Sequence, residues 1–94
     1  MTKAELVTKI ADKTGIDRTV VLETVESMMD AVKETMSSGE NIYLRGFGSF
    51  VIKHRAEKTG RNISKKTTIK IPAHNVPSFK PAKVFVEEVK KNVK

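Results

Sequence analysis

One strongly basic stretch, residues 53–70, holds the side chains best suited to binding a ligand. It contains seven lysine or arginine residues and one acid, Glu57, so it carries a charge of +6 in a chain whose total is +7. Such side chains displace the counterions condensed on nucleic acids, which is the main source of affinity that does not depend on sequence. We therefore expect an arm that binds a polyanion. Its candidate contacts are Lys53, Arg55, Lys58, Arg61, Asn62, Ile63, Lys65, Lys66 and Lys70.

The middle of this stretch adds two features to its charge. Arg61 and Asn62 offer donors of the kind that enter a minor groove. Ile63 is the only sizeable apolar residue between positions 54 and 68, and no core lies within its reach in the sequence. It would either wedge between base pairs or pack against the arm itself.

Charge is divided unevenly between the two parts of the chain. Residues 1–40 have five basic and eight acidic groups, a net charge of −3, whereas residues 41–94 have thirteen basic and three acidic groups, a net charge of +10. A uniformly basic chain would be consistent with solubility alone. This division instead indicates one face made for a polyanion.

Catalytic and metal chemistry find no support in the sequence. His54 and His74 stand apart without acidic or cysteine companions, the serines have no nearby base, and the chain contains no cysteine. We expect no enzyme activity, no metal, no cofactor and no small-molecule substrate, and we expect His54 to join the basic face. The N-terminal residues alternate charged and apolar types, so we also expect no signal peptide, no membrane span and a cytoplasmic protein.

Two helices are predicted at the start of the chain. Thr2 begins a capping box before a helix that ends near Gly15, and Asp17 is a suitable N-cap for a helix over about residues 18–38. The apolar stripe of the second helix is wider than one short helix can cover. We expect both the sheet and a second copy of the chain to cover it.

The pattern changes to a period of two from Asn41 onward. It predicts two strands joined by a turn at residues 45–48, a third strand at 67–73, and a hairpin arm between the second and third strands. A last helix is predicted at about 82–92. The predicted fold is a single α+β domain over 1–94, in which 1–40 are a helical dimerisation part, 41–81 are a three-stranded antiparallel sheet with an arm at about 53–72, and 82–94 are a C-terminal helix.

Four segments resemble the bacterial HU/IHF family of DNA-bending proteins: GFGSF (46–50), HRAEKTGRN (54–62), IKIPA (69–73) and VPSFKPAK (76–83). The spacing agrees along nearly the whole chain without a gap. The resemblance implies an intertwined homodimer, or a heterodimer with a paralogue, that is associated with the nucleoid and holds double-stranded DNA between two arms. It implies body contacts to phosphate from Gly46, Ser49, Lys80 and Lys83. With the helical stripe, it predicts a dimer core of Val25, Met29, Val32, Leu44, Phe47, Phe50 and Phe79.

The chain departs from the family mainly at the tip of the arm. Ile63 stands where the family usually has an intercalating proline, and Lys65 and Lys66 stand where it usually has threonine and glycine. Lys58 replaces a customary arginine, and Ala82 a customary glycine. Isoleucine is among the apolar residues that wedge base steps, and the two extra lysines should strengthen phosphate binding.

The main hypothesis is therefore an architectural protein that binds duplex DNA with little sequence preference and bends or compacts it. Three alternatives stay open at this point: a sequence-specific subunit of the IHF type, an RNA-binding module, and a basic protein without a nucleic-acid role. The segment RGFGSFVI (45–52) nearly spells an RNA-recognition signature but contains one residue too many at Ser49, so we interpret Phe47 and Phe50 as core residues.

Overall fold

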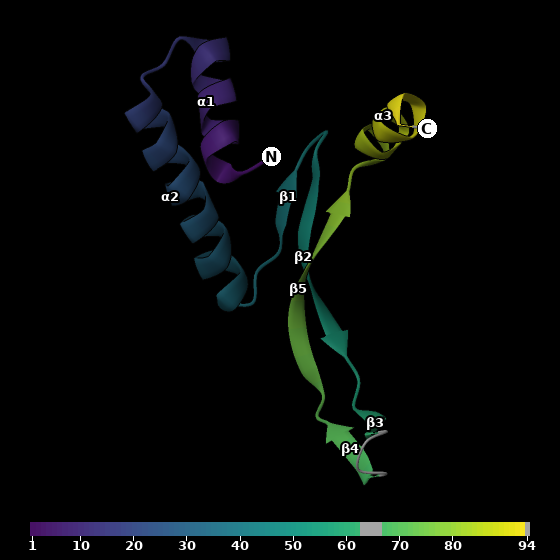
Figure 1. Ribbon diagram of the computed structural model, residues 1–94. Helices are drawn as coiled ribbons and strands as arrows, with labels where there is room; N and C mark the ends of the chain where they lie inside the picture. Colours follow the sequence, from purple (N-terminus) through teal and green to yellow (C-terminus); the bar gives the residue numbers. More distant parts are fainter. Residues whose placement is uncertain (63–66, 94) are drawn as a thin grey trace.

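The computed structural model describes residues 1–62 and 67–93. Its elements confirm the predicted α+β fold with two N-terminal helices, an antiparallel sheet, a hairpin arm and a C-terminal helix. In Figure 1 the first two helices lie beside the strands, and the arm extends far from all three helices. The elements are α1 (Lys3–Thr14), α2 (Arg18–Ser37), β1 (Ile42–Leu44), β2 (Gly48–Arg55), β3 (Lys58–Asn62), β4 (Thr67–Ile71), β5 (His74–Pro81) and α3 (Lys83–Asn92).

The predicted ends of the first two helices are confirmed by their caps. The Thr2 hydroxyl accepts a hydrogen bond from the Glu5 N–H at 3.3 Å, and the Asp17 carboxylate accepts one from the Thr19 N–H at 2.8 Å. Gly15 ends α1 in a left-handed conformation with φ of 75°, and its N–H donates to the Ala11 carbonyl. Side chains and glycine thus satisfy backbone groups that a helix end leaves without partners.

Helices α1 and α2 form a pair around the only two buried apolar side chains of the described residues, Val7 and Val21. The pair is tied at one point by an ion pair of 2.9 Å between Lys3 Nζ and Glu26 Oε1. At another point, Arg18 Nε donates to the Thr8 hydroxyl at 3.1 Å. These contacts fix the two helices as one unit that lies next to the sheet.

The main sheet has the order β1-β2-β5, with both neighbouring pairs antiparallel. Its third strand is β5, residues 74–81, so the prediction of a third sheet strand at 67–73 was wrong. Residues 67–71 form β4 of the arm instead. This strand ends before Pro72, and the strand that pairs with β2 begins at His74. Pro77 and Pro81 fit in β5 because it is an edge strand, whose outer N–H groups need no partner.

The arm is a separate two-stranded sheet formed by β3 and β4. Its register pairs Lys58 with Ile71 and Thr59 with Lys70. Residues 56–57 link it to β2 and residues 72–73 link it to β5, so both limbs leave regular strand structure at the same level. The arm is therefore joined to the main sheet by two short links and not by continuous strands.

The two faces of the main sheet differ in chemistry, as the β2–β5 register shows. Residues directly opposite one another share a face, and successive residues alternate between faces. One face, called here the apolar face, holds Ile42, Leu44, Phe50, Ile52, Pro77 and Phe79. The other, called here the basic face, holds Tyr43, Ser49, Val51, Lys53, Arg55, His74, Val76, Ser78 and Lys80.

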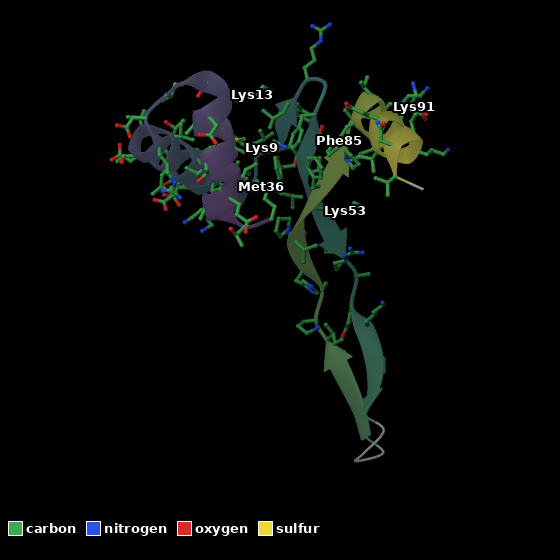
Figure 2. All side chains as sticks on the ribbon, turned by 45° about the horizontal axis from the view of Figure 1, so that its top comes forward. Lys9, Lys13, Met36, Lys53, Phe85 and Lys91 are labelled. Carbon is green, nitrogen blue, oxygen red and sulfur yellow. The ribbon has the colours of Figure 1, made fainter. Side chains whose placement is uncertain are left out.

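Helix α3 packs on the apolar face through an aromatic cluster. The ring of Phe85 stacks on Phe47 with centroids 5.4 Å apart, and Phe79 lies 5.0 Å from Phe50 and 5.2 Å from Phe47. Figure 2 shows the labelled Phe85 between α3 and the strands. Phe47 is nevertheless 45% exposed and Phe79 38% exposed in the single chain, so their place in a dimer core stays a prediction.

The single chain exposes far more surface than a compact monomer. Its accessible surface is 8131 Å², against about 5,400 Å² for a compact monomeric protein of its mass. Its radius of gyration is 18.7 Å, against roughly 12 Å for a compact chain of this length. The extended arm and the partly exposed apolar face both contribute to this difference.

Candidate nucleic-acid interface

The basic face places charged and polar groups from β2 and β5 in one continuous row. Ser49 pairs with Lys80 at one end of the two strands, and Arg55 pairs with His74 at the end next to the arm. Lys53 lies between them, and in Figure 2 it is found just above the narrow junction with the arm. The alternation of β2 thus turns Lys53 and Arg55 to the same side as the body residues Ser49 and Lys80.

The four predicted body contacts come together in one groove. Gly46, Ser49, Lys80 and Lys83 all line an open groove of about 430 Å³ between the β1–β2 turn and the start of α3. The turn is held by a hydrogen bond of 2.9 Å from the Ala82 N–H to the Phe47 carbonyl. Lys80 and Lys83 are exposed, so an anion can reach the groove from solvent.

Sequence reasoning missed two other residues of this groove, Arg45 and Tyr43. Arg45 is exposed in the turn next to Gly46, and Tyr43 is 71% exposed on the basic face opposite Ser49. The signal for Tyr43 was the period of two in β1, which turns it away from Ile42 and Leu44. The signal for Arg45 was its position beside Gly46 in the predicted turn, and the structure gives that glycine a φ of 81°.

The arm presents part of its predicted basic set within the described residues. Lys58 and Lys70 are exposed and belong to opposite limbs, as expected. Lys70 Nζ forms an ion pair of 3.0 Å with Glu57 Oε1, the acid of the basic stretch. Arg61 and Asn62 belong to β3 by their backbone, whereas Ile63, Lys65 and Lys66 lie outside the described residues.

The expectation that His54 joins the basic face was wrong. In the strand it alternates with Lys53 and Arg55, so it lies on the other face of the sheet, opposite Asn75. Its Nδ1 is 3.0 Å from Asn75 Oδ1. The pair sits at the arm end of the apolar face, where the period of two, and not the local excess of charge, decides the direction of a side chain.

The predicted dimer-core residues gather around the apolar face. Val32 lines a groove between α2 and the sheet together with Phe50, and Met36 of the same helix is labelled there in Figure 2. Val25, Val32, Leu44 and Phe50 are partly exposed, and Met29 is 41% exposed. This apolar surface is only partly covered in the single chain, and its role in dimerisation stays a prediction.

A helical base, a sheet with one basic face and a projecting basic hairpin define a small nucleic-acid-binding protein of the α+β class. The family model described as "Bacterial DNA-binding protein" matches residues 1–90. The chain therefore belongs to the bacterial DNA-binding protein family, the HU-like proteins, which are structural DNA-binding proteins and not enzymes. Among the residues described, no helix is long and apolar enough to cross a membrane.

Individual relatives agree with the family match along nearly the whole chain. The SPbeta prophage-derived DNA-binding protein HU 2 of Bacillus subtilis is 40% identical over 90 residues, which cover 96% of this chain and 98% of the relative. The DNA-binding protein HU-alpha of Salmonella typhimurium is 41% identical, with 96% of this chain and 100% of the relative covered.

A solved structure extends the likeness from sequence to fold. The HU protein of Anabaena, solved in a cocrystal structure with DNA, superposes on this chain with a TM-score of 0.90 at 35% identity. The superposition covers 95% of this chain and 97% of that one. Both sequence relatives and this structure carry the name HU. They support a non-specific architectural DNA-binding protein and give no support to the IHF alternative.

Proposed function

We propose that this chain acts as a dimer that binds duplex DNA with little sequence preference and bends or compacts it in the bacterial nucleoid. Two arms would embrace the duplex from one side and enter its minor groove. The basic face and the groove around Ser49 and Lys80 would hold the phosphates between the arms. Affinity would come from counterion release, and any preference among sites from how easily the DNA deforms.

The observation that supports this proposal most is the continuity of the basic face with the arm. Lys80 and Ser49 at one end, Lys53 and Arg55 toward the other, and Lys58 on β3 follow one another along a single elongated body. The molecule measures 57 × 34 × 28 Å, and its long axis suits contacts spread along a duplex. A compact binding pocket would not need this extent.

The uncovered apolar surface supports the dimer. Met29, Phe47 and Phe79 are each about two-fifths exposed, and only two apolar residues of the described chain are buried. Monomeric soluble proteins rarely leave a contiguous apolar surface of this kind, and such a patch marks an association site. A second copy would cover it and place a second arm on the same side by two-fold symmetry.

The proposal is tested by a salt-dependent titration of linear, nicked and pre-bent duplexes of random sequence, with bending read by energy transfer between the DNA ends. A dimer that makes six to ten phosphate contacts should lose roughly 10³–10⁵ in affinity between about 50 and 200 mM salt. Shortened end-to-end distance on binding is the expected second signal. A nearly flat salt dependence, or a strong preference for a selected sequence over random DNA, would contradict the proposal.

One pair of variants locates the phosphate contacts in that titration. Lys80→Ala should weaken binding to all sequences and reduce the salt slope by about 1 for each protomer. Lys91→Ala is the control, because Lys91 lies near the end of α3, away from the basic face (Figure 2). Equal effects of the two substitutions would mean that overall charge, and not the groove, determines affinity.

A further inference from the structure

The side chain of Asn41 connects the edge of the main sheet to the exposed ring of Tyr43. Asn41 is the residue before β1 and lies outside the strand ladder, because the pairing of β1 with β2 begins at Ile42. Its amide nevertheless forms two hydrogen bonds. The Ile52 N–H of β2 donates to Asn41 Oδ1 at 3.0 Å, and Asn41 Nδ2 lies 3.3 Å from the Tyr43 hydroxyl oxygen.

The direction of both hydrogen bonds follows from the chemistry of the partners. A backbone N–H can only donate, so the amide oxygen of Asn41 faces Ile52. The amide nitrogen therefore faces Tyr43 and donates to its hydroxyl oxygen. The hydroxyl keeps its own hydrogen, and within residues 1–62 and 67–93 no group accepts it. Asn41 thus holds a hydroxyl group whose hydrogen is available to a bound ligand.

This hydroxyl lies beside a level of the basic face that carries no charge. The pair of Val51 with Ser78 lies between the level of Lys80 and that of Lys53. The two lysine levels are four residues apart along β2, which corresponds to about 13 Å. The hydrogen bond from the residue after Val51 brings the Asn41 amide, and with it the hydroxyl, next to this level. A DNA backbone that contacts both lysines would pass the hydroxyl between them.

We propose that Asn41 is a positioning residue for DNA binding, which fixes the Tyr43 hydroxyl as an uncharged donor to the DNA backbone. The inference rests on the proposed function and adds a contribution of a different kind to it. Lysine and arginine act through the release of counterions, so their contribution falls as salt rises. A neutral hydroxyl releases no counterion, so its contribution to affinity is the same at low and at high salt.

The test measures affinity and salt slope for a random-sequence duplex with the full chain and its variants. Tyr43→Phe keeps the ring and loses the hydroxyl, so it should weaken binding roughly two- to tenfold per protomer without changing the salt slope. In Asn41→Asp the carboxylate still accepts from the Ile52 N–H, but it also accepts from the Tyr43 hydroxyl and so occupies its hydrogen. Adding Tyr43→Phe to Asn41→Asp should therefore have no further effect. The new charge is present in both of these proteins, so their comparison isolates the hydroxyl.

Asn75→Asp is the matched control, because it adds the same charge at another exposed asparagine, whose side chain contacts His54 on the apolar face. In this background Tyr43→Phe should keep its full effect. The inference is overturned if Tyr43→Phe leaves the affinity of the unchanged protein intact or alters its salt slope. It is also overturned if the effect persists in Asn41→Asp or is lost equally in Asn75→Asp. A nearly flat salt dependence of the unchanged protein would instead overturn the proposed function, so the two failures are distinguishable.

Discussion

Gly48 is the single residue on which the geometry of the candidate interface depends most closely. A Cβ atom added there would lie 2.6 Å from the Lys80 carbonyl oxygen and 2.6 Å from Phe79 Cζ. Backbone and a packed ring cannot both move aside without displacing β5. The glycine therefore allows β2 to approach the strand that carries Lys80, whereas Gly46, with φ of 81° and open space around it, serves the turn itself.

We expect Gly48→Ala to lower the free energy of unfolding by about 1–3 kcal/mol, as overpacking does. It should also weaken DNA binding, because it displaces Lys80 from the groove. Urea unfolding at a fixed protein concentration and a DNA titration measure the two effects. Gly46→Asn is the control: asparagine tolerates a positive φ, and no atom lies within 4 Å of the added Cβ. If the Gly46 variant is the less stable of the two, the close approach at Gly48 is not the limiting contact.

Among the secondary-structure elements, the arm differs from the strands that support it. β3 and β4 pair only with each other, and the links at 56–57 and 72–73 interrupt both limbs. The ion pair between Glu57 and Lys70 spans this junction, with side chains 49% and 76% exposed. Glu57 therefore holds Lys70 in the single chain, and a DNA phosphate would have to compete with it for this cation.

We expect Glu57→Gln to tighten duplex binding roughly two- to fivefold per protomer, because it releases Lys70. Stability should change by less than about 1 kcal/mol, since exposed ion pairs contribute little. Glu87→Gln makes the same change of charge on α3 and should have a smaller effect on affinity. A titration at constant salt compares the two variants. Equal tightening would show that net charge, and not the junction, is responsible.

The sequence was sufficient for the elements whose signals are local. The caps at Thr2, Gly15 and Asp17 and the change to a period of two at Asn41 placed both first helices and the start of the sheet. The third strand was misplaced because Ile69 and Ile71 alternate clearly, while Pro77 and Pro81 argue against a strand. Residues 74–81 form the third strand of the main sheet because they pair with β2, a segment distant in sequence. The prolines are tolerated there because β5 is an edge strand.

The residues of the candidate site could largely be predicted from the sequence, but the face of the sheet on which each side chain lies could not. Charge and the family resemblance indicate Lys53, Arg55, Lys80 and Ser49, but only the strand register shows that they share one face. The prediction for His54 failed because its neighbours in sequence are basic, whereas the alternation of the strand turns it to the other face. Tyr43 and Arg45 were missed because they join the groove only through the fold of the β1–β2 turn.

For the molecule as a whole, the feature that most needs an explanation is the apolar surface that a single chain exposes to solvent. Met29 and Val20 on α2 are similarly exposed, at 41% and 51%. They are nine residues apart, which corresponds to opposite sides of a helix at 3.6 residues per turn. Met29 lies on the side of Met36, which lines the groove next to the sheet. Only the Met29 side is expected to meet a second copy.

Met29→Lys should therefore abolish the dimer and, with it, high-affinity DNA binding, because a lysine ammonium would be buried without a partner in the interface. Val20→Lys should leave both unchanged. Sedimentation of each variant over a range of concentrations measures assembly, and the unfolding temperature of the unchanged protein should rise with its concentration, as it does for a dimer that folds on association. If the unchanged protein sediments as a monomer, or if the two variants sediment equally, the proposed dimer interface is wrong. The apolar face would then need another partner, since Val7 and Val21 alone cannot stabilise so open a chain.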